Sequence, residues 1–137
     1  MGENAAGLYA VALYSGLLGL VYLWLLAIVG KTRGDLKISI GDGGDPYMIR
    51  VMRGQLNFVE NVPLTLVFLV LMALIGTPVW VLHVFGLALL VGRILHGLHF
   101  TKRDAPGWQR AAGAGLTNLT QLFIALGLIA HAIAGLF

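Results

Sequence analysis

The sequence predicts an all-α integral membrane protein, built as an antiparallel bundle of four transmembrane helices. Of its 137 residues, 58% are hydrophobic and only 11% are charged, and the mean hydropathy is +0.88. Soluble domains carry about 25% charged residues. The apolar residues fall into runs long enough to cross a bilayer. We therefore expect one membrane domain that spans residues 1–137.

The composition also excludes several classes of function. The chain has no cysteine, so any thiol chemistry must use a thiol of the substrate. The net charge is +3, but no basic run is long enough to form a nucleic-acid footprint. His96 and His99 are three residues apart, but no nearby carboxylate completes a metal site. We expect neither a nucleic-acid partner nor a metal.

The first two helices are separated by a long polar loop. Residues 8–30 are predicted to form an uncleaved transmembrane helix, because no basic residue precedes them as in a signal peptide. Residues 31–45 are rich in glycine and aspartate but lack the full pattern of a P-loop or an EF-hand. Asp45 followed by Pro46 is typical of a helix N-cap with proline at the first helical position.

The second helix is predicted at 46–75, with Pro63 inside it and able to kink it. A tight uncharged turn leads to a third helix at 79–100. A polar loop at 101–109 then leads to a fourth helix at 110–137.

The basic residues predict the orientation. They lie in or near the first and third loops, and the N-terminus, the second turn and the C-terminus have none. By the positive-inside rule these two loops are cytoplasmic and both termini lie outside the cytoplasm. The nine basic positions are Lys31, Arg33, Lys37, Arg50, Arg53, Arg93, Lys102, Arg103 and Arg110.

A polar stripe on the second helix is the candidate site. Arg50, Arg53, Asn57 and Glu60 are spaced by 3, 4 and 3 residues. They fall within roughly 80° of arc on a helix, and Asn61 shares that arc. Ionisable groups in a membrane helix usually face a bundle interior or a water-filled cavity.

The third helix adds Arg93 and His96, which lie within about 60° of each other on a helical wheel. Glu60 and Arg93 reach a similar depth, so we expect Glu60 to pair with Arg93 or Arg53. The excess of arginine suits a ligand that carries carboxylates.

Other interpretations of these residues stay open. Arg50 and Arg53 could reach lipid headgroups, and Glu60 could be a structural ion-pair partner. Asn57 could connect two helices, and His96 could be an interior histidine rather than a ligand contact.

The motifs resemble those of a known family. Within residues 53–63 an arginine is followed by asparagine four residues on, glutamate three further on and proline three further on. This pattern resembles the helix-two signature of the MAPEG family, the membrane-associated proteins in eicosanoid and glutathione metabolism. Gly92 to His96, followed by Phe100, resembles the family's helix-three segment, and Arg110 its helix-four arginine. The loop at 40–45 is similar to that of small bacterial members.

The resemblance implies a homotrimer in a bacterial inner membrane, with glutathione as co-substrate between neighbouring subunits near the cytoplasmic side. Gln55 would face the adjacent subunit, and Lys31 stands near the family's basic residue at the end of helix one. Together with the stripe, the candidate glutathione-binding residues are Lys31, Arg50, Arg53, Gln55, Asn57, Glu60, Arg93 and His96.

The resemblance makes Arg110 the candidate catalytic residue. It would stabilise the glutathione thiolate, which would attack a lipophilic electrophile that arrives from the bilayer. The chain departs from the family at Asn61, His96 and Phe100, where several members have tyrosine, and at Ala111, where the family has serine after the arginine.

The expected function is that of a membrane-bound glutathione-dependent transferase or peroxidase. A non-catalytic lipid-binding or scaffold protein of the same fold is the alternative, so the sequence leaves open whether the protein is an enzyme. A small multidrug exporter with four helices is a third reading. Against this interpretation, the membrane glutamate of this chain, Glu60, lies among arginines, which would repel the cationic drugs that such exporters carry.

Overall fold

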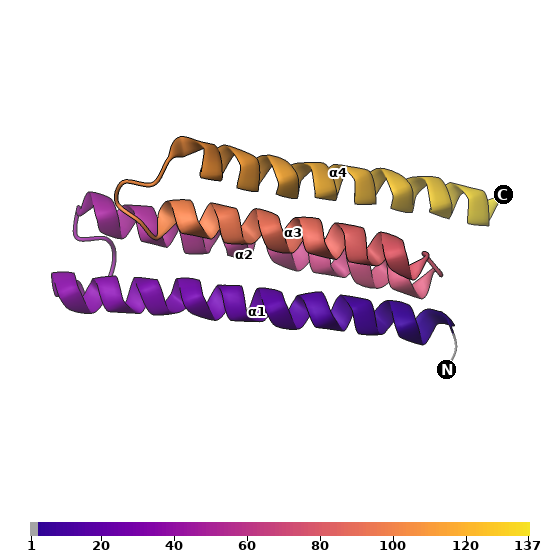
Figure 1. Ribbon diagram of the computed structural model, residues 1–137, viewed down its shortest axis with the longest axis horizontal. Coiled ribbons are helices and arrows are strands. Elements are labelled where there is room, and N and C mark those ends of the chain that lie inside the picture. The colour runs from indigo at the N-terminus through magenta and orange to yellow at the C-terminus, as the bar shows by residue number, and fades with distance from the viewer. Residues whose placement is uncertain (1–2) are drawn as a thin grey trace.

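The computed structural model describes residues 3–137, which form four α-helices: α1 (Glu3–Leu36), α2 (Pro46–Leu74), α3 (Val79–Phe100) and α4 (Gly107–Leu136). The helices lie side by side and alternate in direction, so that α1 begins at the end of the bundle where α4 ends (Figure 1). All four are long and apolar enough to cross a membrane. The predicted all-α fold with four candidate spans is confirmed.

Helix α1 is longer than the predicted span of residues 8–30. It continues to Leu36, which packs with Ile38 against the buried cluster that includes Met48. The helix ends where Lys37 adopts a left-handed φ of 56° and the N–H of Ile38 donates to the carbonyl of Arg33 at 3.0 Å. Apolar contacts made by residues after position 30 therefore stabilise a longer α1 than its polar local composition predicts.

Helix α2 begins as predicted. The Asp45 side chain accepts from the N–H groups of Tyr47 and Met48, at 2.8 and 2.9 Å, and Pro46 occupies the first turn. This geometry satisfies two N–H groups that lack a partner within the helix. The expected cap is confirmed. Pro63 lies inside α2, and the helix continues beyond it to Leu74, one residue short of the predicted end.

Helix α3 has the predicted bounds, whereas α4 begins at Gly107 rather than residue 110 and ends at Leu136. Pro106 has an extended backbone, with φ −65° and ψ 140°. Its carbonyl accepts from the N–H of Gln109 at 3.3 Å, so that the helix starts directly after the proline. Arg110 is therefore in the first turn and a half of α4 and not at its first residue.

Helices α2 and α3 are both central in the bundle. Each contacts the other three helices, whereas α4 contacts α2 and α3 but, within the described residues, not α1. The buried core includes Leu18, Leu69, Leu82, Leu89 and Ile124. Because α4 packs only against α2 and α3, many apolar side chains of α2 and α4 are exposed in the single chain.

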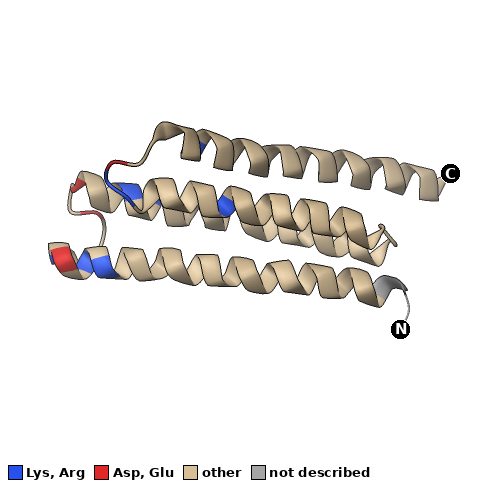
Figure 2. Ribbon diagram, viewed as in Figure 1, with Lys and Arg blue, Asp and Glu red and all other residues tan. Residues whose placement is uncertain are grey.

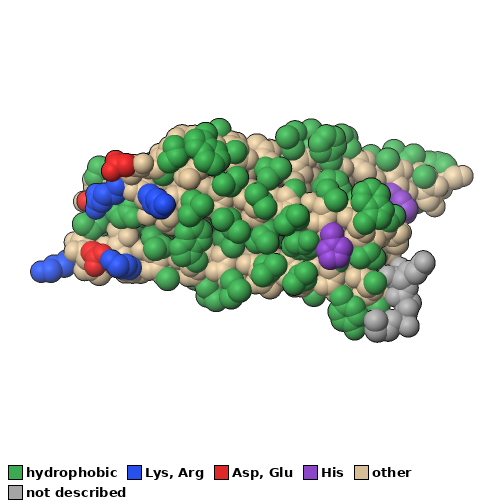
Figure 3. All heavy atoms as spheres, in the orientation of Figure 1, with side chains coloured by type: hydrophobic (Ala, Val, Ile, Leu, Met, Phe, Trp, Pro, Cys, Tyr) green, Lys and Arg blue, Asp and Glu red, His purple; other side chains and the backbone are tan. Residues whose placement is uncertain are grey.

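Charge and apolar surface are separated along the bundle. Most of the Lys, Arg, Asp and Glu residues gather at the end where α1 and α3 finish and α2 begins, and one basic position lies part-way along α3 (Figure 2). Hydrophobic side chains cover most of the visible face between the two ends (Figure 3). Such a surface is unsuited to water and suited to lipid, in agreement with four membrane-spanning helices.

Candidate functional site

A cavity of about 320 Å³ brings together predicted site residues from three helices. Arg53 and Asn57 come from α2, His96 from α3 and Arg110 from α4. Phe100 and Ala114 complete the lining. The lining contains two arginines and no carboxylate, so it suits an anionic ligand.

Arg93 lies behind this cavity and joins the three helices that form it. It is only 2% exposed. Its Nη1 donates to Oδ1 of Asn57 at 2.7 Å, and its Nη2 donates to the carbonyl of Gly113 at 3.2 Å. Its Nε is buried without a hydrogen-bond partner. The guanidinium therefore has neutral acceptors on two sides and an unused donor.

The predicted ion pair of Glu60 with Arg93 or Arg53 is wrong. Among residues 5–137, whose side chains the structure describes, the one ion pair is between Lys31 and Asp35, and Glu60 is exposed. Glu60 lies about 60° around the helix from Asn57. Asn57, and not Glu60, accepts the hydrogen bond from the Arg93 guanidinium. The carboxylate of Glu60 consequently faces out of the single chain and does not line the cavity.

Two glycines set the separation of α3 and α4 beside Arg93. A Cβ added to Gly113 would lie 2.6 Å from the carbonyl oxygen of Gly92 and 2.7 Å from the backbone nitrogen of His96. A Cβ added to Gly92 would lie 3.0 Å from Oγ1 of Thr117 and 3.1 Å from the carbonyl oxygen of Gly113, so the absence of a side chain at both glycines permits this close approach. It brings the Gly113 carbonyl to Arg93, and the same carbonyl accepts from Oγ1 of Thr117 at 2.9 Å.

The aromatic wall of the cavity is also held by close packing. His96 is 4% exposed and stacks on Phe100 with a centroid distance of 4.7 Å. A Cβ on Gly54 would lie within 2.5 Å of the Phe100 Cβ, so the glycine makes room for this ring against α2. The guanidinium of Arg110 lies 5.9 Å from the Phe100 centroid. The ring of Phe100 therefore lies close to one of the two guanidinium groups of the lining.

The structure does not bring Arg50 to the cavity. Its Nε donates to the carbonyl of Lys102 at 2.9 Å, and its Nη2 donates to the carbonyl of His99 at 2.6 Å. Nη2 also lies 2.9 Å from Nε2 of His99, whose Nδ1 lies 3.1 Å from the carbonyl of Pro106. Arg50 thus fastens α2 to the end of α3. A structural role for His99 agrees with its place in the last turn of α3, but the sequence did not identify Arg50 as its partner.

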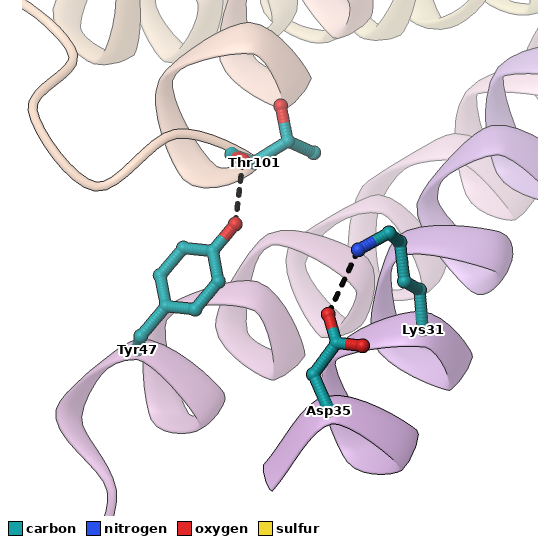
Figure 4. A network of polar contacts seen from close by, with 4 residues as sticks. All are labelled: Lys31, Asp35, Tyr47 and Thr101. Carbon is teal, nitrogen blue, oxygen red and sulfur yellow. Dashed lines mark hydrogen bonds and ion pairs between the residues drawn. The ribbon is translucent and has the colours of Figure 1, made fainter.

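Lys31 and Gln55 also lie apart from the cavity. Nζ of Lys31 is 2.8 Å from the carboxylate of Asp35, with both side chains largely exposed (Figure 4). Gln55 lines a second hollow of about 450 Å³ on the other side of α2, and Arg53 is shared by both spaces. Gln55 is therefore not among the residues that line the cavity with Asn57 and Arg110.

These features define a four-helix membrane protein with a cationic cavity between its helices, close to the charged end of the bundle. The chain belongs to the MAPEG family, whose model matches residues 11–130. It is similar to the inner membrane protein YecN from two strains of Escherichia coli. The identity to each is 32% over 92 residues, which cover 67% of this chain and 70% of the relative.

Proposed function

We propose that this protein is a glutathione-dependent transferase or peroxidase that acts on lipophilic electrophiles within the membrane. The observation that carries the proposal is the cavity with Arg53 and Arg110 in its lining and no carboxylate. Arg93 lies behind it without an acidic partner in the described part of the chain. Glutathione carries two carboxylates, and the MAPEG family includes glutathione transferases.

The charges assign parts of glutathione to parts of the cavity. Arg53 would bind a carboxylate of the tripeptide, because a guanidinium fits a carboxylate with two parallel hydrogen bonds. Asn57 would bind through its amide nitrogen, since its Oδ1 already accepts from Arg93. Arg93 would act through Asn57 and through the positive potential of its buried charge.

Glu60 would bind the ammonium group of glutathione at an interface between subunits. An exposed carboxylate in a membrane-spanning helix is costly unless a partner or water-filled space covers it. Glu60 and Gln55 both face outwards from α2, and α4 leaves much of α2 uncovered. These positions support the homotrimer that the family resemblance implies, with a neighbouring subunit closing the site.

Arg110 would supply the chemistry by lowering the pKa of the glutathione thiol, since a nearby cation favours the thiolate. The thiolate sulfur would form a bond to an electrophilic atom of the substrate as the leaving group departs with its electron pair. The substrate would enter from the bilayer. The relatives are named as inner membrane proteins, which supports an inner-membrane location with the charged loops in the cytoplasm.

A non-catalytic lipid-binding protein of the same fold is the second candidate. It is favoured by one feature of the lining, which contains no hydroxyl group because His96 and Phe100 occupy positions where several family members have tyrosine. Stabilisation of a thiolate then depends on Arg110 without help from a phenol.

Thiolate absorbance and turnover in detergent micelles test the proposal. The wild-type protein should show thiolate absorbance on addition of glutathione and should conjugate glutathione to a chlorodinitrobenzene. Arg110→Gln should lose the absorbance and most of the turnover but keep glutathione binding. Lys102→Gln, which removes the same charge outside the cavity, should leave all three unchanged. Binding by the wild type without thiolate or turnover would refute the enzyme and favour the lipid-binding candidate.

A further inference from the structure

A second cationic hollow lies at the charged end of the bundle. It has a volume of about 270 Å³ and is lined by Pro46, Tyr47, Arg50 and Arg103. It shares no lining residue with the cavity that holds Arg53 and Arg110. We call it the headgroup hollow, and it has no part in the proposed glutathione chemistry.

Arg103 lies over an oriented ring. Its guanidinium carbon lies 4.2 Å from the ring centroid of Tyr47. The Tyr47 hydroxyl donates to the carbonyl of Thr101 at 2.8 Å, which fixes the ring beneath the end of α3 (Figure 4). A guanidinium stacked on a ring keeps the N–H groups along its edge free for a ligand.

Arg50 is anchored at the same hollow with one donor group to spare. Its Nε and Nη2 donate to carbonyl groups at the end of α3, whereas its Nη1 makes no hydrogen bond in the described part of the chain. Neither Arg50 nor Arg103 forms an ion pair with the side chains of residues 5–137. The first free N–H groups of α2 are already bonded to Asp45, so the two guanidinium groups, and not the helix end, would recognise an anion.

The hollow lies where a membrane presents phosphate groups. Pro46 is the first residue of α2, and Arg103 follows α3 by three residues, so both stand at the boundary between apolar helices and charged loops. Basic residues at this boundary attract anionic lipids, and a planar guanidinium binds phosphate oxygens in pairs. We propose that the headgroup hollow binds the phosphate group of an anionic glycerophospholipid. This inference does not rest on the proposed glutathione function.

The test compares lipids added to the full-length protein in detergent micelles. Phosphatidylglycerol should raise the melting temperature of the wild type in a saturable way, and phosphatidylcholine at the same mole fraction should not. Arg103→Gln should need about tenfold more phosphatidylglycerol than Lys102→Gln for half of the maximal shift, as expected for loss of a charge-assisted pair of hydrogen bonds. Lys102 is the matched control, because it is the adjacent cation and does not line the hollow.

A conservative variant, a check of helicity and inorganic phosphate serve as controls. Arg103→Lys keeps the charge but loses the planar fork, so the phosphatidylglycerol it needs for half of the maximal shift should fall between the values for the wild type and Arg103→Gln. Far-ultraviolet circular dichroism must show the same helicity for each variant. Equal losses in the variants at 102 and 103 would overturn the proposal in favour of unspecific attraction. Equal protection by inorganic phosphate, lost in Arg103→Gln, would overturn the lipid as occupant.

Discussion

The contact between α3 and α4 yields a prediction with a matched control. Gly113→Ala should destabilise the protein by about 1–3 kcal/mol, the usual cost of overpacking. The new Cβ would lie 2.6 Å from the carbonyl oxygen of Gly92, which is 0.8 Å inside an ordinary contact of 3.4 Å. The neighbouring atoms belong to the backbone or to a Cβ and cannot rotate away, so α4 must shift. The carbonyl that accepts from Arg93 would move with it.

Gly115→Ala is the control for this variant. A Cβ at Gly115 would meet no atom within 4 Å, and alanine favours a helix over glycine by about 1 kcal/mol. This variant should therefore be as stable as the wild type or more so. Thermal unfolding in detergent, followed by circular dichroism, compares the two, and calorimetry should show weaker glutathione binding for Gly113→Ala alone. Equal stability of both variants would refute the inference that Gly113 sets the helix separation.

Three further changes test other contacts. Arg93→Gln should weaken glutathione binding at least about tenfold in calorimetry, because a charge-assisted bond to α2 and the potential behind the cavity are lost together; unchanged affinity would remove the residue from the site. Lys37→Gly should raise the free energy of unfolding by about 0.5–1 kcal/mol, because φ is 56° at this position; a lower melting temperature would contradict this. Gln121→Leu should lower the free energy of unfolding by about 1 kcal/mol, since Nε2 of Gln121 donates to the carbonyl of Asn61 and to Oγ1 of Thr65 on α2. An unchanged chemical unfolding curve would argue against this link.

Hydropathy and turn chemistry predict most of the fold. The number of helices, the bounds of α3 and the cap at Asp45 follow from local sequence, because long apolar runs and an Asp-Pro pair have few alternative structures. The end of α1 could not be predicted in the same way. It depends on Leu36 packing near Met48 of the next helix, and a contact between two helices is not specified by the polar local composition of residues 31–36.

The candidate site could be predicted only in part. Helical periodicity places Arg53 and Asn57 on one face, and both line the cavity with Arg110 and His96. Periodicity does not say which acceptor a long side chain reaches. Arg93 donates to the amide of Asn57 rather than to a carboxylate, because Gly113 lets α4 supply its second acceptor and hold the guanidinium inside the chain.

The outcome at Arg50 has a similar cause. Its position on the polar stripe suggested a ligand contact. In the structure, two carbonyl groups at the end of α3 accept hydrogen bonds from two of its nitrogen atoms. The last carbonyls of a helix lack partners within the helix and attract a nearby guanidinium. Which helix end lies beside which arginine is a property of the packed bundle.

The central claim is that the cationic cavity between α2, α3 and α4 binds glutathione. Isothermal titration calorimetry of the detergent-purified protein tests it directly, with Arg53→Gln as the test variant and Lys102→Gln as the control for charge. We expect saturable binding to the wild type and to Lys102→Gln, and loss of binding in a folded Arg53→Gln protein. The absence of binding to the wild type, or undiminished affinity in Arg53→Gln, would contradict the claim.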